Sequence, residues 1–340
     1  MKCERLTAFA LGSRRAAMLV LILLSGSLAA PAPASAAARH LSIDVRAFIH
    51  AMVYKHGFSR QELTRIFSDV QPRRRVLERI KAPTTARPWH EFRAITLTRE
   101  RIDAGVKFWG IHEKVLQRAS AEYGIPEEII VATIGIESQY GHHMGGFRVI
   151  DALTTLAFQY PPRAGFFREE LEQLLLLARE TGLDPLRIRG SYAGAIGIPQ
   201  FMPSSYRKYA KDFDGDGKPD LVNSVPDTVA SIANYYRSFG WRSGEPVAVK
   251  AAVKATGANT VNDELVEPRT NLADLEKRGI MPLAPVAENL PAAPFAVEGK
   301  SGKEYWLGFK NFYVITRYNR SINYALAVHV LAGELRAEKR

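Results

Sequence analysis

Apolar residues recur every three or four positions along most of the chain beyond its first forty residues. This period is that of an α-helix, and it predicts helices at residues 45–53, 60–68, 102–123, 166–180, 227–239 and 323–335. Residues 82–88 contain Pro83 and Pro88 and predict a connection between an N-terminal helical segment, residues 37–88, and a main body, residues 89–340. The pattern therefore predicts a mainly helical protein.

The pattern changes between residues 246 and 314. Residues 247–249 and 312–315 are rich in β-branched and aromatic side chains and predict short strands. Four prolines between residues 282 and 294 disfavour a helix between them. We therefore expect a small β-containing insertion at residues 246–314, and a mainly α fold of the α+β class.

The first 36 residues have the composition of a secretory signal peptide. Four basic residues precede an apolar run at residues 16–28, and the small residues 34–36 (Ala-Ser-Ala) fit a cleavage site. The run is short for a bilayer span, although a retained N-terminal anchor is the alternative. We expect export to the periplasm by a cleavable signal, with no stable membrane anchor afterwards.

The chain has one cysteine, Cys3, which lies ahead of the apolar run. A lipoprotein would need its cysteine at the end of that run, so Cys3 is not a lipid anchor. The exported chain would hold no cysteine, which excludes disulfides, thiolate catalysis and cysteine-bound zinc.

The formal net charge is +11. A basic exported protein suits an anionic polymer as its partner. Nucleic acid is the generic alternative, but no basic helix or stacking motif supports it, so no nucleic-acid partner is expected.

One carboxylate falls on an apolar helix face. Pro126 and the two acids that follow it are typical of a helix start. In the helix that they begin, Ile130, Ile134 and Glu137 share one face, at positions i, i+4 and i+7. A buried glutamate tends to stay protonated, which is the state that a general acid needs. The spacing alone leaves open a glutamate that only reaches solvent or pairs with Arg148.

Residues 190–200 form a run of small side chains that would allow a ligand to approach the backbone closely. Gln200, at its end, supplies a neutral donor and acceptor suited to the N-acetyl and hydroxyl groups of an amino sugar. Tight packing of a turn against a helix is the alternative.

Two segments carry a family resemblance, Glu-Ser-Gln-Tyr-Gly at residues 137–141 and Gly-Ser-Tyr-Ala-Gly-Ala-Ile-Gly-Ile-Pro-Gln-Phe-Met-Pro-Ser-Ser-Tyr at residues 190–206. They resemble the signatures of lytic transglycosylases and goose-type lysozymes. Their order and spacing, from about residue 89 onwards, are similar to the membrane-bound lytic transglycosylase B family. The resemblance implies a lysozyme-like helical core, peptidoglycan glycan strands as substrate, and Glu137 as the catalytic residue. It also implies a substrate cleft with contacts from Ser191, Gln200, Tyr318, Asn319 and Tyr324, and from Phe92 where the family has a tyrosine.

An acidic loop at residues 212–227 fits the first half of an EF-hand, with Asp212, Asp214 and Asp216 in the D-x-D-x-D-G pattern. Its twelfth position is Asn223 in place of the bidentate glutamate. The resemblance implies an enlarged loop in which Lys218 also takes part and Asp227 closes the site. We expect a structural Ca²⁺ with no chemical role, and a solvated acidic turn is the alternative.

No second carboxylate suits a hydrolytic pair with Glu137, since Asp151 lies in an ordinary helix-start context. A lone glutamate suits the non-hydrolytic route that the resemblance implies, which leaves 1,6-anhydro-MurNAc ends and needs no cofactor for the chemistry. The alternatives are a hydrolytic muramidase, a non-catalytic peptidoglycan-binding envelope protein and a calcium-controlled binding protein. A monomer is expected.

Overall fold

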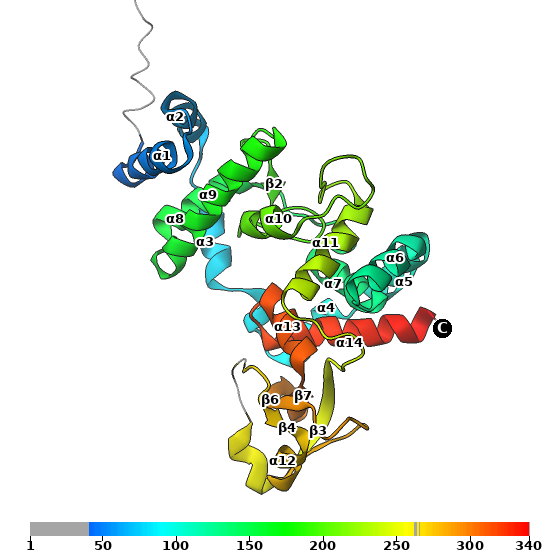
Figure 1. Ribbon diagram of the computed structural model, residues 1–340. Helices are drawn as coiled ribbons and strands as arrows, with labels where there is room; N and C mark the ends of the chain where they lie inside the picture. Colours follow the sequence, from blue (N-terminus) through cyan, green and yellow to red (C-terminus); the bar gives the residue numbers. More distant parts are fainter. Residues whose placement is uncertain (1–40, 262–263, 265, 340) are drawn as a thin grey trace, which may run out of the picture.

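The computed structural model describes residues 41–261, 264 and 266–339 (Figure 1). The signal peptide expected at residues 1–36 lies outside the described residues. Within those residues, no helix is both long enough and apolar enough to cross a bilayer.

The fold is mainly α with a β-containing insertion, as the sequence predicted. The longer helices are α1 (Ile43–His56), α2 (Arg60–Asp69), α3 (Arg74–Lys81), α4 (Trp89–Thr96), α5 (Arg99–Ile111), α6 (Glu113–Tyr123), α7 (Glu127–Ser138), α8 (Val149–Gln159), α9 (Ala164–Thr181), α10 (Pro203–Tyr209), α11 (Val225–Ser238), α12 (Leu272–Lys277), α13 (Lys310–Tyr318) and α14 (Ile322–Lys339). The strands are β1 (Phe147–Arg148), β2 (Arg189–Gly190), β3 (Ala248–Val253), β4 (Thr270–Asn271), β5 (Ile280–Pro282), β6 (Pro291–Gly299) and β7 (Gly302–Gly308).

The N-terminal helices pack on the main body. Ser42 and Ser59 cap the starts of α1 and α2, and each side chain accepts a backbone N–H bond of the first turn. Phe48 of α1 contacts Phe67 of α2 and Phe158 of α8 edge to face, at ring-centroid distances of 5.8 and 6.1 Å. These helices therefore lie beside α8 and α9 (Figure 1) and share their hydrophobic core.

The single helix predicted at residues 102–123 is wrong. The structure has two helices, α5 and α6, joined at His112, whose φ of −107° and ψ of 18° lie outside the helical region. Both helices contact α7, one on each side of the bend. The apolar period runs through the bend without a proline, so the sequence pattern does not mark it.

The strand predicted at residues 312–315 is also wrong, because this stretch lies in helix α13. Phe312, Val314 and Ile315 are all buried. A helix that is covered on several sides has apolar residues in a continuous run, which is also the pattern of a buried strand. The strand predicted at residues 247–249 is confirmed in part by β3.

The insertion is a five-stranded antiparallel sheet in the order β4-β6-β7-β3-β5. Strands β6 and β7 form a hairpin in which Phe295 pairs with Trp306 and Gly299 pairs with Gly302. The sheet lies to one side of α14, and the helical body lies to the other (Figure 1).

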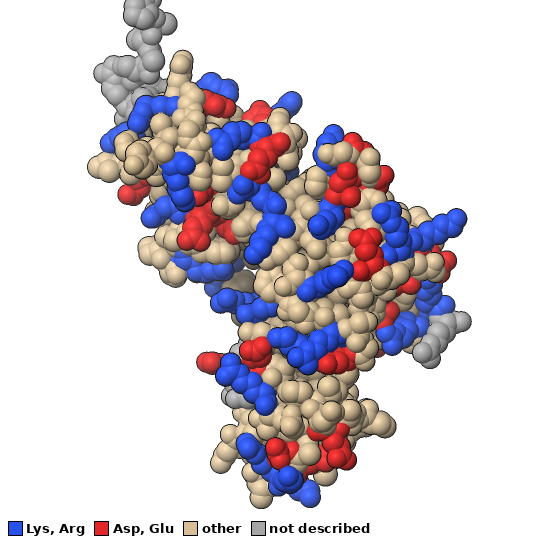
Figure 2. All heavy atoms as spheres, in the orientation of Figure 1, with Lys and Arg blue, Asp and Glu red and all other residues tan. Residues whose placement is uncertain are grey.

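Helix α7 lies at the centre of the helical body. It contacts α5, α6, α11 and α14, and residues 129–135 are all buried. Lys and Arg side chains are spread over the face in Figure 2, interspersed with acids, so the net positive charge forms no single stripe there.

Candidate active site

Glu137 lies in the last turn of α7, and its side chain is half-buried. The Tyr324 hydroxyl, from α14, donates a hydrogen bond of 2.6 Å to Glu137 Oε1. Burial raises the pKa of Glu137 to about 7, and the bond from Tyr324 opposes that shift. Glu137 is therefore a carboxyl group that both gains and loses a proton near neutral pH.

A tight turn after α7 fixes the direction of Glu137. Gln139 and Tyr140 both have left-handed backbones, with φ of 48° and 58°. The Tyr140 ring reaches back between α5 and α7, and its hydroxyl donates to the Arg101 carbonyl at 3.0 Å. A Cβ atom on Gly135 would lie 2.5 Å from the Tyr140 hydroxyl, which explains the glycine in this helix.

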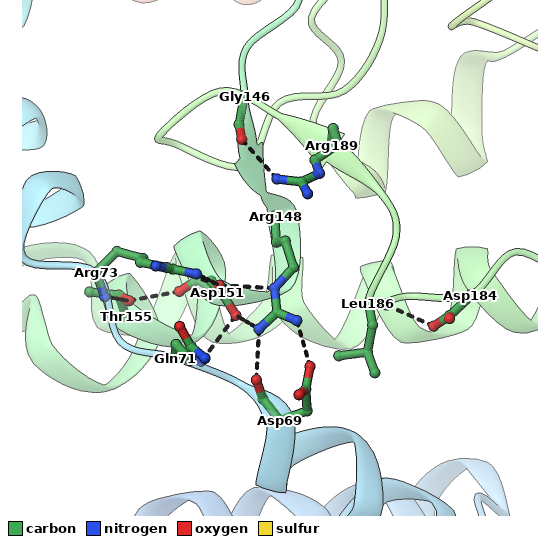
Figure 3. A network of polar contacts seen from close by, with 10 residues as sticks. All are labelled: Asp69, Gln71, Arg73, Gly146, Arg148, Asp151, Thr155, Asp184, Leu186 and Arg189. Atoms are coloured by element: carbon green, nitrogen blue, oxygen red, sulfur yellow. Dashed lines mark hydrogen bonds and ion pairs between the residues drawn. The ribbon is translucent and has the colours of Figure 1, made fainter.

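The alternative pairing of Glu137 with Arg148 is not what the structure shows. Arg148 instead forms ion pairs with Asp69 and Asp151 (Figure 3). Asp151 is also bound by Arg73 and is fully buried, so it serves the packing of α8 and does not face Glu137 as a second acid. Among the described residues, no other carboxyl group contributes to the pKa of Glu137.

The small-residue loop between β2 and α10 is held by the two polar residues predicted to bind substrate. The Ser191 hydroxyl accepts bonds from the amides of Ala193 and Ala195, at 3.2 and 3.0 Å. Gln200 has a left-handed φ of 51°, and its amide nitrogen donates to the Met144 and Gly197 carbonyls at 3.0 and 2.8 Å. Gln200 thus ties this loop to the segment after α7, and its side-chain carbonyl is the atom left to accept a bond from a ligand.

The predicted tyrosines lie beside Glu137. Tyr318 and Tyr324 have nearly parallel rings, 16° apart with centroids separated by 6.3 Å. The Tyr318 hydroxyl donates to the Pro199 carbonyl at 2.5 Å, so α13 is joined to the small-residue loop. Asn319 is exposed, directly after α13, and its amide is free to meet a ligand.

The sequence did not single out two further tyrosines. Tyr235 and Tyr236 of α11 lie close enough to Glu137 for its charge to help raise their pKa values, although burial is the larger cause for both. The Tyr236 hydroxyl forms a 2.8 Å bond with Thr133 of α7. In the sequence these two tyrosines are marked only by their place in a predicted helix, and any tyrosine of the hydrophobic core has such a place.

Phe92 lies in α4 with only 3% of its surface exposed. The structure therefore places it in the hydrophobic core, where a ligand would reach at most the edge of its ring.

The acidic loop gathers three of its five predicted ligands. Carboxylate oxygens of Asp212, Asp214 and Asp227 lie within 4.8 Å of one another, and Asp216 is not one of this group. Asp216 and Lys218 are both exposed in the same loop. Asp227 is fully buried and accepts bonds from the amides of residues 213, 214 and 220. Three converging carboxylates suit a hard cation such as Ca²⁺.

A family model described as "Transglycosylase SLT domain" matches residues 42–333. Membrane-bound lytic murein transglycosylase B of Escherichia coli (strain K12) is 43% identical over 291 residues, which cover 83% of this chain and 79% of that protein. The structure of catenated lytic transglycosylase SltB1 from Pseudomonas aeruginosa superposes with a TM-score of 0.83 at 44% identity, covering 88% of this chain and 99% of that one. The Escherichia coli lytic transglycosylase Slt35 in complex with calcium gives a TM-score of 0.80 at 40% identity, with 87% and 94% covered.

The family resemblance in the two motif segments and the lysozyme-like core that it implied are thereby confirmed. The chain belongs to the transglycosylase SLT domain family and is a lytic transglycosylase.

Proposed function

We propose that this enzyme cleaves the β-1,4 bond between MurNAc and GlcNAc of peptidoglycan without water, with Glu137 as acid and then as base. The observation that carries the proposal is a single half-buried carboxyl group whose pKa lies at about 7. A group with that pKa is protonated often enough to donate to a glycosidic oxygen, and its anion is basic enough to take the proton back.

The chemistry follows from the lone carboxylate. Glu137 protonates the bridging oxygen, and the bond to C1 of MurNAc breaks while the acetamido group of the substrate supports the developing cation. The Glu137 carboxylate then removes the proton of the C6 hydroxyl, whose oxygen bonds to C1. The product is a 1,6-anhydro-MurNAc end, and the enzyme returns to its protonated state.

The remaining cleft contacts are part of the same proposal. Asn319 and the Gln200 carbonyl would bind acetamido or hydroxyl groups, and the Tyr318 ring would stack on a sugar face. Ser191 would act mainly through the shape of its loop, because its oxygen already accepts two amides.

Digestion of purified cell wall tests the reaction. Mass spectrometry should show 1,6-anhydro-MurNAc ends, whose mass is one water lower than that of reducing ends. Digestion in water enriched in ¹⁸O should leave these ends unlabelled. Labelled reducing MurNAc ends would identify a hydrolytic muramidase and overturn the proposal.

Changing Tyr324 to phenylalanine should alter the pH dependence. Loss of the bond to Glu137 removes the contact that lowers its pKa, so the carboxyl group should stay protonated to higher pH. Wild-type kcat/KM should fall as pH rises through about 7, and in Tyr324→Phe this fall should move to higher pH. We expect kcat to drop about tenfold as well, because the carboxyl group loses the bond that orients it.

Tyr313→Phe, which removes a hydroxyl that does not contact Glu137, is the control. An unchanged alkaline limb in Tyr324→Phe would contradict the assignment.

We propose that Asp212, Asp214 and Asp227 hold a structural Ca²⁺, with Asp216 and Lys218 completing the loop around it. The gathered carboxylates support this, as does the relative whose structure is a complex with calcium. The ion would offset repulsion among the acids and order the connection between α10 and α11.

Chelation should therefore lower stability and leave the chemistry intact. With millimolar Ca²⁺ in place of EDTA, we expect the Tm to rise by several degrees, because an ion that binds only the folded state stabilises it. Activity at 25 °C should change less than twofold. Asp214→Asn should lose the response to Ca²⁺, whereas Asp274→Asn, on α12, should keep it. A Tm independent of Ca²⁺ would leave the loop as a solvated acidic turn.

We also propose that the protein acts in the periplasm as a monomer after cleavage of a signal peptide at residues 1–36. The composition of that segment and the peptidoglycan substrate support this location. N-terminal sequencing of the secreted protein would test the cleavage.

A further inference from the structure

A hollow of about 610 Å³ lies between α7, α14 and the β-containing insertion. Its polar lining comes from Glu128, Trp241, Glu245, His329 and Arg336, of which Glu245 is already paired with Arg242. Aliphatic side chains of the β3 and β5–β6 regions, such as Val247 and Leu290, form the facing wall. A volume of this size is typical of a small-molecule site.

The hollow is separate from the cleft at Glu137. Glu128 precedes Glu137 by nine residues on the same helix, which is a rotation of half a turn and a rise of about 13 Å. The two acids therefore lie on opposite sides of α7, so a ligand in the hollow would not be an extension of the glycan.

The hollow contains an acidic and a basic side chain that could each bind a charged group of a ligand. Glu128 is only 7% exposed, and its carboxylate contacts the guanidinium of Arg336, which stays largely in solvent. Arg336 has five N–H donors, so one carboxylate contact leaves others available. An acid and a cation thus stand side by side at the edge of a partly apolar hollow.

Two neutral groups beside this ion pair lack polar partners. The Trp241 indole N–H is buried without a hydrogen bond. His329 makes a ring contact with Trp306 at 6.1 Å, but its ring nitrogens bond no described residue. Burial lowers the pKa of His329 to about 4, so its ring is neutral at pH 7 and offers one donor and one acceptor.

Gly333 of α14 lines the hollow and is exposed. It lies inside α14, where glycine is less stable than alanine. A Cβ atom at this position would meet no heavy atom within 4 Å, so packing does not require the glycine. It lies four residues after His329 and three before Arg336, and therefore shares their helix face. Open space along that face lets a ligand approach the helix backbone.

We propose that this hollow binds a zwitterionic ligand of the amino-acid or short-peptide class. The ligand carboxylate would bind Arg336, its ammonium would bind Glu128, and its side chains would lie against the aliphatic wall. The half-buried ring of His329 would bond its peptide group. A zwitterion offers a carboxylate to the remaining N–H donors of Arg336 and an ammonium to Glu128, whereas a simple anion or a neutral sugar would match at most one of these two charged groups.

Calorimetric titration with alanylalanine, which has both termini free, tests the proposal. We expect saturable binding of one dipeptide per chain. N-acetylation or C-amidation of the dipeptide should weaken it at least tenfold, since each removes one charge. No binding up to 10 mM, or equal binding of the blocked dipeptides, would overturn the proposal.

Matched variants locate the site. Gly333→Phe, which fills the hollow, and Arg336→Gln should each abolish binding, whereas Gly333→Ala should keep it within threefold. Glu137→Gln should also bind normally, because its cleft lies on the other side of α7. Binding that survives Gly333→Phe and Arg336→Gln, or that is lost in Glu137→Gln, would place the dipeptide elsewhere and refute this site.

Discussion

Replacement of Glu137 by glutamine should lower the release of anhydro-muropeptides by at least about a thousandfold, because a positioned acid and base contributes typically 10²–10⁴-fold. Glutamine keeps the size of the side chain and can still accept the Tyr324 hydrogen bond. It can neither donate a proton to the glycosidic oxygen nor accept one from the C6 hydroxyl. Both half-steps are therefore lost together.

The same variant should be more stable than the wild type above neutral pH. The pKa of Glu137 is raised from 4.5 to about 7 in the folded protein, which therefore holds this proton more tightly than the unfolded chain does. The stabilisation that the bound proton provides is complete below pH 4.5 and is lost as the pH rises to about 7. Glutamine has no such dependence. We expect equal Tm values below pH 4.5 and a higher Tm for Glu137→Gln above pH 7.

Glu127→Gln, in the first turn of the same helix, is the matched control and should retain activity within about twofold, because Glu127 bonds Trp109 far from the turn that holds Glu137. Activity of Glu137→Gln above one tenth of wild type would exclude the acid–base role. A loss of activity together with a lowered Tm would indicate a structural glutamate instead.

The site could be predicted in part because Glu137 follows local rules. Its position relative to Ile130 and Ile134 places it on a buried face, and burial is what raises its pKa. The partner that opposes this shift, Tyr324, is 187 residues away, and no helical period reveals such a contact. Only the family resemblance brought Tyr324 and Tyr318 into the predicted cleft.

The errors in the predicted fold have the same origin. The bend at His112 and the helix at Phe312 depend on packing against α7 and the sheet. A short apolar run is in addition equally typical of a strand and of a buried helix. Asp151 is a further case. The sequence shows an ordinary acid at a helix start, whereas the structure makes it the centre of a long-range network.

That network joins the N-terminal segment to α8 and β1 of the main body (Figure 3). Asp151 is fully buried. Its carboxylate accepts hydrogen bonds from the backbone N–H of Gln71 and from the guanidinium groups of Arg73 and Arg148. Arg148 belongs to β1, which pairs with β2 directly before the Ser191 loop. The carboxylate thus holds the connection between α2 and α3 against the strand that leads to the cleft.

Asp151→Asn should therefore lower the free energy of unfolding by about 3–5 kcal/mol, the usual cost when one partner of a buried ion pair is removed. The amide can accept fewer bonds, and its NH₂ group would face two guanidinium groups. Guanidinium chloride unfolding, followed by circular dichroism, measures the change. Asp69→Asn, which removes an exposed partner of Arg148, is the control and should cost about 1 kcal/mol or less. Because Asp151 lies outside the catalytic chemistry, the folded fraction of Asp151→Asn should release anhydro products at near the wild-type rate. Equal stabilities for the two variants would show that the buried network does not hold the N-terminal helices in place.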